Sequence, residues 1–258
     1  MSTQNETLQK TPGSHQEAYI KMDRHLGDSL VCLNLIYSYH VKNNVGVRVF
    51  GSSTVKALFD LFDFGGMTFG GGWSESREPE ICINEFLSKG ANPESTFLRN
   101  RHMRFDKKLG FDSKGIVLPK CRIKRFGYNH NVYFQFDSRS PRNHGKKPLT
   151  PTECRMILSQ RSRSNPIAIG GKDTRIYLGG YMYHLGDLFG ISKNLLGCRK
   201  FIGVDSGMSH LAGTLGVKSE IINMHDIRSV ERELMEFYWE MYPSTVSFRR
   251  QDLLSKLI

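Results

Sequence analysis

Residues 200–222, KFIGVDSGMSHLAGTLGVKSEII, contain the pattern that decides the fold. The apolar run at 201–204 is typical of a buried strand, and it ends at Asp205. Ser206 and Gly207 make a turn from which a helix begins at once, and a second apolar strand follows. A strand, a tight turn, a helix and a further strand in this order predict a parallel α/β sheet.

The same alternation extends in both directions from this stretch. A first wound sheet is predicted from a short strand near residue 20, an apolar helix, a strand at 45–51 and a helix from residue 53. The second sheet is predicted from strands at 131–138, 166–171, 175–180, 201–205 and 219–224, and from helices that begin at 151, 184, 207 and 229. We therefore expect a disordered leader at 1–18, an N-terminal α/β lobe at 19–117 and a C-terminal α/β lobe at 118–258.

Charge and composition narrow the classes of partner. The 258 residues include 36 Lys and Arg against 25 Asp and Glu, a formal net charge of +11. This excess favours polyanionic partners such as nucleic acid, lipopolysaccharide, an acidic membrane face or a phosphate-bearing ligand. The chain contains no apolar run of about 18 residues, and its N-terminus lacks the apolar centre of a signal peptide. The five scattered cysteines, with no CxxC pair, argue against a disulfide framework or a zinc site. We therefore expect a cytoplasmic protein.

The end of the strand at 201–204 is a candidate binding site. Open α/β sheets bind ligands at the carboxyl ends of their strands, where helix N-termini present free amides. A diphosphate bound there would meet the amides of residues 206–208, and His210 would follow one helical turn later. Asp205 could accept hydrogen bonds from sugar hydroxyls. The alternative is that Asp205 and Ser206 only cap the helix.

The segment 201–216, FIGVDSGMSHLAGTLG, resembles the signature of the heptosyltransferases, glycosyltransferase family nine. The resemblance implies a GT-B-like α/β fold of two wound lobes with a cleft between them, in which the final helix packs back on the first lobe. It also implies a nucleotide-sugar donor. Donor-binding roles are implied for Asp205, Ser206, Gly207 and His210.

Residues 24–36, RHLGDSLVCLNLI, resemble the opening pattern of the same family. The family's Asp at this place is the proposed general base, so the resemblance implies that Asp28 deprotonates an acceptor hydroxyl. A carboxylate that faces the cleft suits this role. The alternative is an Asp that only interacts with the helix dipole. The family usually has a proline several residues further on, where this chain reads VCLNL.

A looser resemblance covers residues 131–158, NVYFQFDSRSPRNHGKKPLTPTECRMIL, and the strand and turn PIAIGGKDTR at 166–175. It implies donor-binding roles for Ser138, Arg139, Lys146, Lys147 and Gly171. The first four are candidates for neutralising the leaving diphosphate. Lys146 and Lys147 are equivalent candidates, and a solvated basic loop is the alternative. The chain has no Asp-x-Asp, and its histidines lack the spacing of metal ligands. We therefore expect no metal and no cofactor beyond the nucleotide-sugar co-substrate.

Basic clusters point to the acceptor. Eight Lys or Arg and a single acidic residue, Asp137, lie between residues 120 and 147, and a second basic cluster occupies 97–108. Two such clusters beside a cleft suit a long polyanion. The predicted acceptor-binding residues are Arg24, His25, Arg101, Arg104, Lys124 and Arg125.

The sequence thus predicts a metal-independent, inverting glycosyltransferase that moves a sugar from a nucleotide-diphosphate donor to a hydroxyl of a polyanionic acceptor. The favoured acceptor is a hydroxylated base in DNA, as for a phage enzyme that acts in the host cytoplasm. The core of lipopolysaccharide is the alternative acceptor, and a catalytically inactive nucleic-acid-binding module is the second hypothesis. An epimerase or dehydrogenase is disfavoured because no GxGxxG follows the first strand. The oligomeric state stays open.

Overall fold

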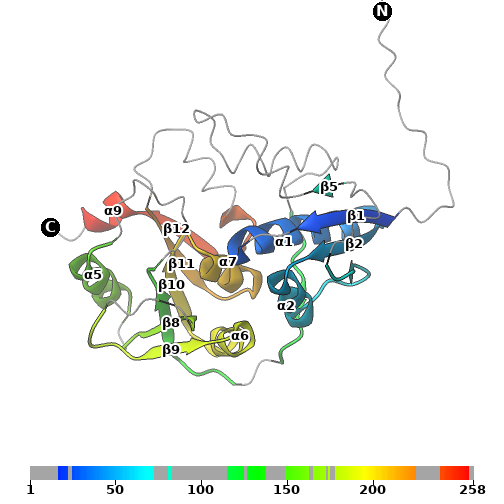
Figure 1. Cartoon of the computed structure of the whole chain (residues 1–258). Coiled ribbons are helices and arrows are strands. Elements are labelled where there is room, and N and C mark those ends of the chain that lie inside the picture. Colours follow the sequence, from blue (N-terminus) through cyan, green and yellow to red (C-terminus); the bar gives the residue numbers. More distant parts are fainter. Residues whose placement is uncertain are drawn as a thin grey trace, which may run out of the picture.

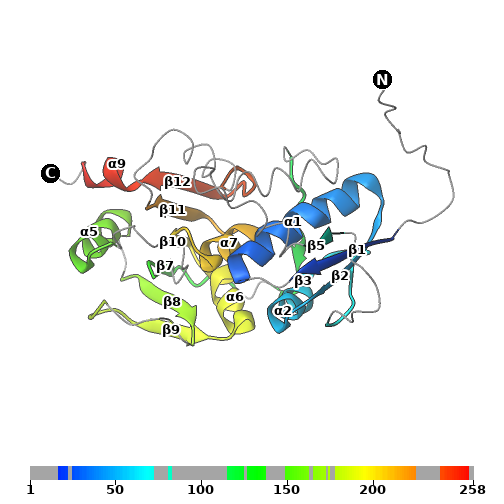
Figure 2. The same ribbon diagram turned by 45° about the horizontal axis from the view of Figure 1, so that its top comes forward.

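The computed structural model describes residues 17–22, 25–72, 81–82, 115–124, 127–137, 149–162, 165–172, 174, 178–224 and 239–255. Figures 1 and 2 show two α/β units side by side, one formed by the blue N-terminal elements and one by the green-to-red elements. Residues 1–16 of the predicted leader lie outside the described part of the chain. Its last two residues, Glu17 and Ala18, already belong to the first strand.

The first unit is a parallel sheet in the order β4-β2-β1-β5. The strands β1 (Glu17–Met22) and β2 (Gly46–Gly51) lie at its centre, in a register that pairs Ile20 with Val49. Helix α1 (Leu26–Asn43) connects them, as the sequence predicts for a βαβ crossover. The remaining elements of this unit are α2 (Ser53–Leu61), β3 (Phe62–Asp63), β4 (Thr68–Phe69) and β5 (Ile81–Cys82).

The second unit is a six-stranded sheet in the order β12-β11-β10-β7-β8-β9, and every neighbouring pair is parallel. Because all six strands run in one direction, their carboxyl ends meet at one edge of the sheet. Its strands are β7 (Val132–Gln135), β8 (Ile167–Gly171), β9 (Tyr183–Gly186), β10 (Lys200–Val204), β11 (Ser219–Asn223) and β12 (Thr245–Arg249). Its helices are α5 (Pro151–Arg161), α6 (Leu188–Gly197), α7 (Gly207–Thr214) and α9 (Arg250–Leu254).

Two predicted elements differ from the structure, and two further elements were not predicted. The strand expected at 175–180 is a turn in its described residues 178–180, and the strand lies at Tyr183–Gly186 instead. Helix α6 accordingly begins at Leu188 rather than at residue 184, because Asp187 caps it by accepting a hydrogen bond from the amide of Gly190. Strand β12 and helix α9 were not predicted at all. Of the helix expected at 229–242, residues 229–238 lie outside the described ranges.

A single hydrophobic core joins the two units. It contains Ile20 and Leu33 from the first unit and Phe201, Leu211 and Tyr242 from the second. Helix α1 lies against α7, and its N-terminal half is buried without interruption from Ser29 to Ile36. The short strand β6 (Lys120–Cys121) pairs with β3, close to the lobe boundary predicted at residues 117 and 118. That boundary stays a prediction.

Candidate functional site

The turn between β10 and α7 is held by side chains of its own and of the neighbouring strand. Ser206 is the N-cap of α7, and its hydroxyl accepts a hydrogen bond from the amide of Ser209. The same hydroxyl donates to the side-chain oxygen of Gln135 at the end of β7, over 3.0 Å. The Ser209 hydroxyl in turn donates to the carbonyl of Val204. The turn is therefore fixed, and Asp205 is presented at the edge of the sheet with 27% of its side chain exposed.

The N-terminus of α1 meets the N-terminus of α7. A β-carbon built on Gly207 would lie 3.0 Å from the amide nitrogen of Gly27 and 3.1 Å from the β-carbon of Leu26. A β-carbon on Gly27 would lie 3.2 Å from the α-carbon of Gly207. Only glycine allows two backbones to approach this closely without displacement. The first amides of a helix have no intrahelical partner and carry partial positive charge, so two such ends converge here.

Asp28 belongs to the first turn of α1, one residue after this contact, and is partly exposed. Asp205 lies two residues before Gly207, on the other side of the same contact. The contact of Gly27 with Gly207 therefore brings together the two segments that carry the predicted carboxylates, although they are far apart in the sequence.

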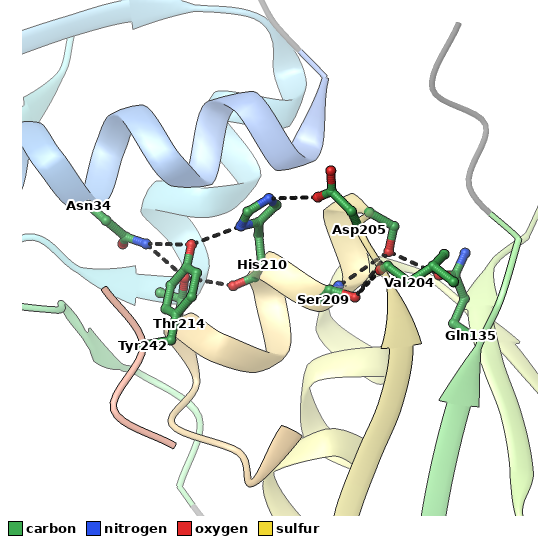
Figure 3. A network of polar contacts seen from close by, with 9 residues as sticks. Asn34, Gln135, Val204, Asp205, Ser209, His210, Thr214 and Tyr242 are labelled. Carbon is green, nitrogen blue, oxygen red and sulfur yellow. Dashed lines mark hydrogen bonds and ion pairs between the residues drawn. The ribbon is translucent and has the colours of Figure 1, made fainter. Parts of the chain in front are cut away.

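His210 connects this place to a buried polar network, drawn in Figure 3. Its Nε2 lies 3.5 Å from a carboxylate oxygen of Asp205, and its Nδ1 lies 3.1 Å from the phenol oxygen of Tyr242. The Nδ2 of Asn34 donates to the Thr214 hydroxyl over 2.9 Å and to the Tyr242 phenol over 3.5 Å. The network thus links α1, α7 and the segment that leads to β12.

Tyr242 and Trp239 enclose the imidazole. The indole of Trp239 is stacked on His210, with ring centroids 4.8 Å apart and planes at 15°. Tyr242 is fully buried, and burial raises the pKa of its phenol well above the ordinary value; hydrogen bonds with Thr214 and Asn34 lower it in part, and the nearby Asp205 charge raises it. The phenol therefore remains protonated in this site.

The predicted site residues divide into three groups. Asp28, Asp205, Ser206, Gly207 and His210 come together around the contact of α1 and α7. Gly171 ends β8 at the same edge of the sheet, two strands away from β10. Of the predicted acceptor-binding residues, His25 is the exposed N-cap of α1, and Lys124 is exposed after β6. The other predicted residues lie outside the described ranges, and they are Ser138, Arg139, Lys146, Lys147, Arg24, Arg101, Arg104 and Arg125.

Sequence reasoning missed five residues that build the site, namely Asn34, Gln135, Thr214, Trp239 and Tyr242. A signal was present for Asn34, because it is a polar residue within the apolar run of α1. Tyr242 and Trp239 gave no comparable signal, since large aromatic residues are usual in any core. Their role depends on contacts with His210, which lies about 30 residues earlier in the sequence.

The described residues hold no group of three or more His, Cys, Asp or Glu arranged to bind a metal. Metal independence stays a prediction, because several ranges of the chain are not described. No helix in the described ranges is long and apolar enough to cross a bilayer.

The arrangement of two wound α/β units, with helix N-termini facing each other beside the sheet edge, is the GT-B fold of glycosyltransferases, as comparison with solved structures shows. The heptosyltransferase TibC, solved as an iron-containing dodecamer in complex with ADP-D-beta-D-heptose, superimposes with a TM-score of 0.61 at 16% identity. A family 9 glycosyl transferase from Veillonella parvula gives 0.58 at 10% identity, covering 92% of this chain and 87% of that one. The E. coli heptosyltransferase WaaC with ADP gives 0.52 at 10% identity and covers 91% of both chains.

These likenesses establish the fold, and with it the predicted GT-B class. The match to TibC covers 90% of this chain but only 62% of the TibC chain, and a second TibC structure, from enterotoxigenic E. coli, is covered over 58% of its length. No protein-family model matches the sequence, and no curated protein matches it either. The resemblance that the sequence motifs predicted is therefore confirmed at the level of structure.

Proposed function

We propose that the chain is a metal-independent, inverting glycosyltransferase that uses a nucleotide-diphosphate sugar. The contact of α1 with α7 at Gly27 and Gly207 is the observation that carries this proposal. It places a partly exposed carboxylate, Asp28, beside the helix end at which the sequence predicts a diphosphate. The GT-B fold supports the proposal, because solved neighbours with this fold are heptosyltransferases named with ADP or ADP-heptose.

The donor would bind at the N-terminus of α7. The amides of Gly207 and Met208 are the first two of this helix, and they suit the oxygens of a diphosphate. The Ser206 hydroxyl is already used within the protein by Gln135 and Ser209, so its contribution is to hold the turn rather than to bind the donor through its side chain. Asp205 retains an exposed face from which it can accept hydrogen bonds from sugar hydroxyls.

The transfer is a single displacement. Asp28 takes the proton of the acceptor hydroxyl as its oxygen forms a bond to the anomeric carbon. The bond from that carbon to the diphosphate oxygen breaks, and the electron pair leaves with the nucleoside diphosphate. Amides and basic groups stabilise the charge that develops on the leaving group. Attack on the face opposite to the leaving group inverts the anomeric centre.

We retain the predicted contributions of the basic residues as part of this proposal. Ser138, Arg139 and one of Lys146 and Lys147 would neutralise the leaving diphosphate. The net charge of +11 supports a polyanionic acceptor, and His25, at the N-cap of α1, lies only three residues before Asp28. We propose a hydroxylated base in DNA as the acceptor, for an enzyme of phage origin acting in the host cytoplasm.

A mass-spectrometric transfer assay tests the proposed function. The protein is incubated with a panel of nucleotide sugars and with either hydroxymethylated DNA or truncated lipopolysaccharide, and the added mass is measured on each acceptor. Added sugar on the DNA alone supports the full proposal. Added sugar on the saccharide alone supports the transferase and overturns the DNA acceptor. Salt-dependent DNA binding without transfer or donor hydrolysis would identify an inactive binding module.

A further inference from the structure

The polar contacts that link Asn34, Tyr242, His210 and Asp205 suggest a direction for the hydrogen bonds among them. We propose that Tyr242 is a positioning residue that donates its phenol hydrogen to Nδ1 of His210 and so places the single proton of the neutral imidazole on Nε2, which faces Asp205. This proposal deepens the proposed function, on which its role in transfer rests. The geometry of the network in Figure 3 carries it.

The direction begins at Asn34. Its Nδ2 can only donate, and it lies 2.9 Å from the Thr214 hydroxyl and 3.5 Å from the Tyr242 phenol oxygen. The Thr214 hydroxyl hydrogen is already given to the carbonyl of His210, over 2.9 Å. In the proposed direction, the phenol oxygen accepts from Asn34, and the phenol hydrogen goes to an acceptor other than the Thr214 oxygen, which already accepts from Asn34.

The imidazole supplies that acceptor. Its Nδ1 lies 3.1 Å from the Tyr242 oxygen, inside a site where His210 and Tyr242 are 6% and 1% exposed. A neutral imidazole has one nitrogen that accepts and one that donates. If Nδ1 accepts from the phenol, Nε2 carries the hydrogen, and Nε2 lies 3.5 Å from a carboxylate oxygen of Asp205.

Packing holds both rings in this relation. Trp239 is stacked on the imidazole and fixes its plane. Gly213 leaves the space that the tyrosine ring occupies, because a β-carbon there would lie 2.5 Å from Cγ of Tyr242. The result is a fixed N–H group that points from a buried site toward the exposed carboxylate beside the proposed donor.

The consequence for the proposed transferase concerns Asp205. An Nε2–H beside it orients the carboxylate and keeps one oxygen engaged, so the other is presented to the donor in one orientation. Tyr242 does not touch the donor in this arrangement and acts only through His210. Loss of its hydroxyl should therefore weaken binding of the nucleotide sugar, and transfer, by roughly two- to tenfold, the usual effect of one hydrogen bond between neutral groups.

Nitrogen NMR tests the proposal directly. Long-range proton–nitrogen correlations of histidine-labelled protein at pH 8, where an ordinary imidazole is neutral, report which nitrogen carries the proton. The chain has nine histidines, and a His210→Gln variant assigns the signal. We expect His210 to hold its proton on Nε2 in the wild type and to show both tautomers in Tyr242→Phe.

The matched control is Tyr133→Phe, which removes another phenol that lies 3.3 Å from an Nδ1 atom, that of His184. This variant should alter the His184 signal and leave His210 unchanged. A proton on Nδ1 of His210 in the wild type would mean that the imidazole donates to the phenol, and it would overturn the proposal. This measurement is made on the wild-type protein and does not depend on the folding of a variant. An unchanged tautomer in folded Tyr242→Phe would overturn it as well. The tautomer does not depend on turnover, so failure of the proposed function would be seen separately, as absent transfer with the expected spectra.

Discussion

Gly27 and Gly207 are in backbone contact, and through them the first turns of α1 and α7 meet although 180 positions separate them in the chain. The side chain of Leu26 also packs against Gly207. Asp28 follows Gly27 directly and Asp205 lies two residues before Gly207, so the contact joins the two segments that carry the predicted carboxylates. The spacing of these segments depends on the close approach of two backbones at glycine.

A methyl group at this contact should disturb the site. Gly207→Ala must displace the N-terminus of α1, because the new carbon would lie 3.0 Å from the Gly27 nitrogen. We expect a loss of about 1–3 kcal/mol in the free energy of unfolding, as for other overpacked positions, and a larger loss of transfer. Urea unfolding and the transfer assay measure the two effects. Gly179→Ala is the control, since a carbon there meets nothing within 4 Å. Equal stability and equal transfer activity of the two variants would show that the two helix ends can move apart without loss of function.

Asp28→Asn should strongly reduce the rate of transfer without weakening the binding of the donor. Removal of a general base typically reduces the rate about 10²–10⁴-fold. ADP binding, measured by calorimetry, should stay close to that of the wild type, because the amide replaces only the group that takes the proton. Asp252→Asn serves as the control, since it also removes an acidic residue from the first turn of a helix, α9. Undiminished turnover in Asp28→Asn would remove Asp28 from the mechanism.

Gly213→Ala should destabilise the protein even though alanine favours a helix by about 1 kcal/mol over glycine. The new carbon would lie 2.5–2.8 Å from three ring atoms of Tyr242, so this buried ring would be forced out of its packed position. We expect a net loss of about 1–3 kcal/mol in urea unfolding. We also expect His210 to respond in the NMR spectra, because Tyr242 has to shift. A more stable variant would mean that the ring has room to retreat.

The ion pair of Glu153 with Arg250 should make the free energy of unfolding depend on pH in the acidic range. Burial raises the pKa of Glu153, but hydrogen bonds from Arg250 and Thr150 outweigh burial and hold the pKa below its usual 4.5. Arg250 donates to both carboxylate oxygens, over 2.7 and 2.8 Å. A carboxyl with a lowered pKa stabilises the fold above its unfolded-state pKa and loses that contribution as the pH falls through the folded-state value.

Glu153→Gln should therefore be less stable than the wild type at pH 7, by about 1–3 kcal/mol. The two proteins should converge as the pH falls below about 4.5, which urea unfolding between pH 7 and pH 2.5 can follow. Asp60→Asn is the control, because Asp60 pairs with Lys56 in an exposed i,i+4 bridge at 2.7 Å. Such bridges contribute little, roughly 0.3–0.5 kcal/mol. A difference for Glu153→Gln that persists at low pH would point to packing instead of charge.

Sequence patterns predicted the elements with strong periodicity and a clear boundary. Strand β10 is an apolar run that ends at a Ser-Gly turn, and α5 begins with Thr150 and Pro151, a cap and a first-turn proline. Strand β9 was misplaced because YHLG has no alternation, and its pairing with β8 decides its position. Strand β12 was missed for a related reason: it lies at the sheet edge, and its pairing with β11 decides its position.

The part of the candidate site that lies within one short motif could be predicted from the sequence. Asp205, Ser206, Gly207 and His210 lie within six residues, and local geometry relates them. The partners that orient His210 come from α1 and from the segment before β12, so they depend on how the two units pack. Gln135 is likewise brought to Ser206 by the pairing of β7 with β10. No periodicity within a single element reports such contacts.

The hydrophobic core shared by Leu33, Phe201 and Tyr242 bears on how this chain can be divided. A cut near residue 118 would separate two sheets, yet each fragment would expose the face of α1 or α7 that the other covers. Neither piece would be expected to fold and stay soluble alone, whereas the two produced together should reassociate into a working whole. Such complementation could serve as a split reporter, because its signal would depend on the contact between Gly27 in one fragment and Gly207 in the other.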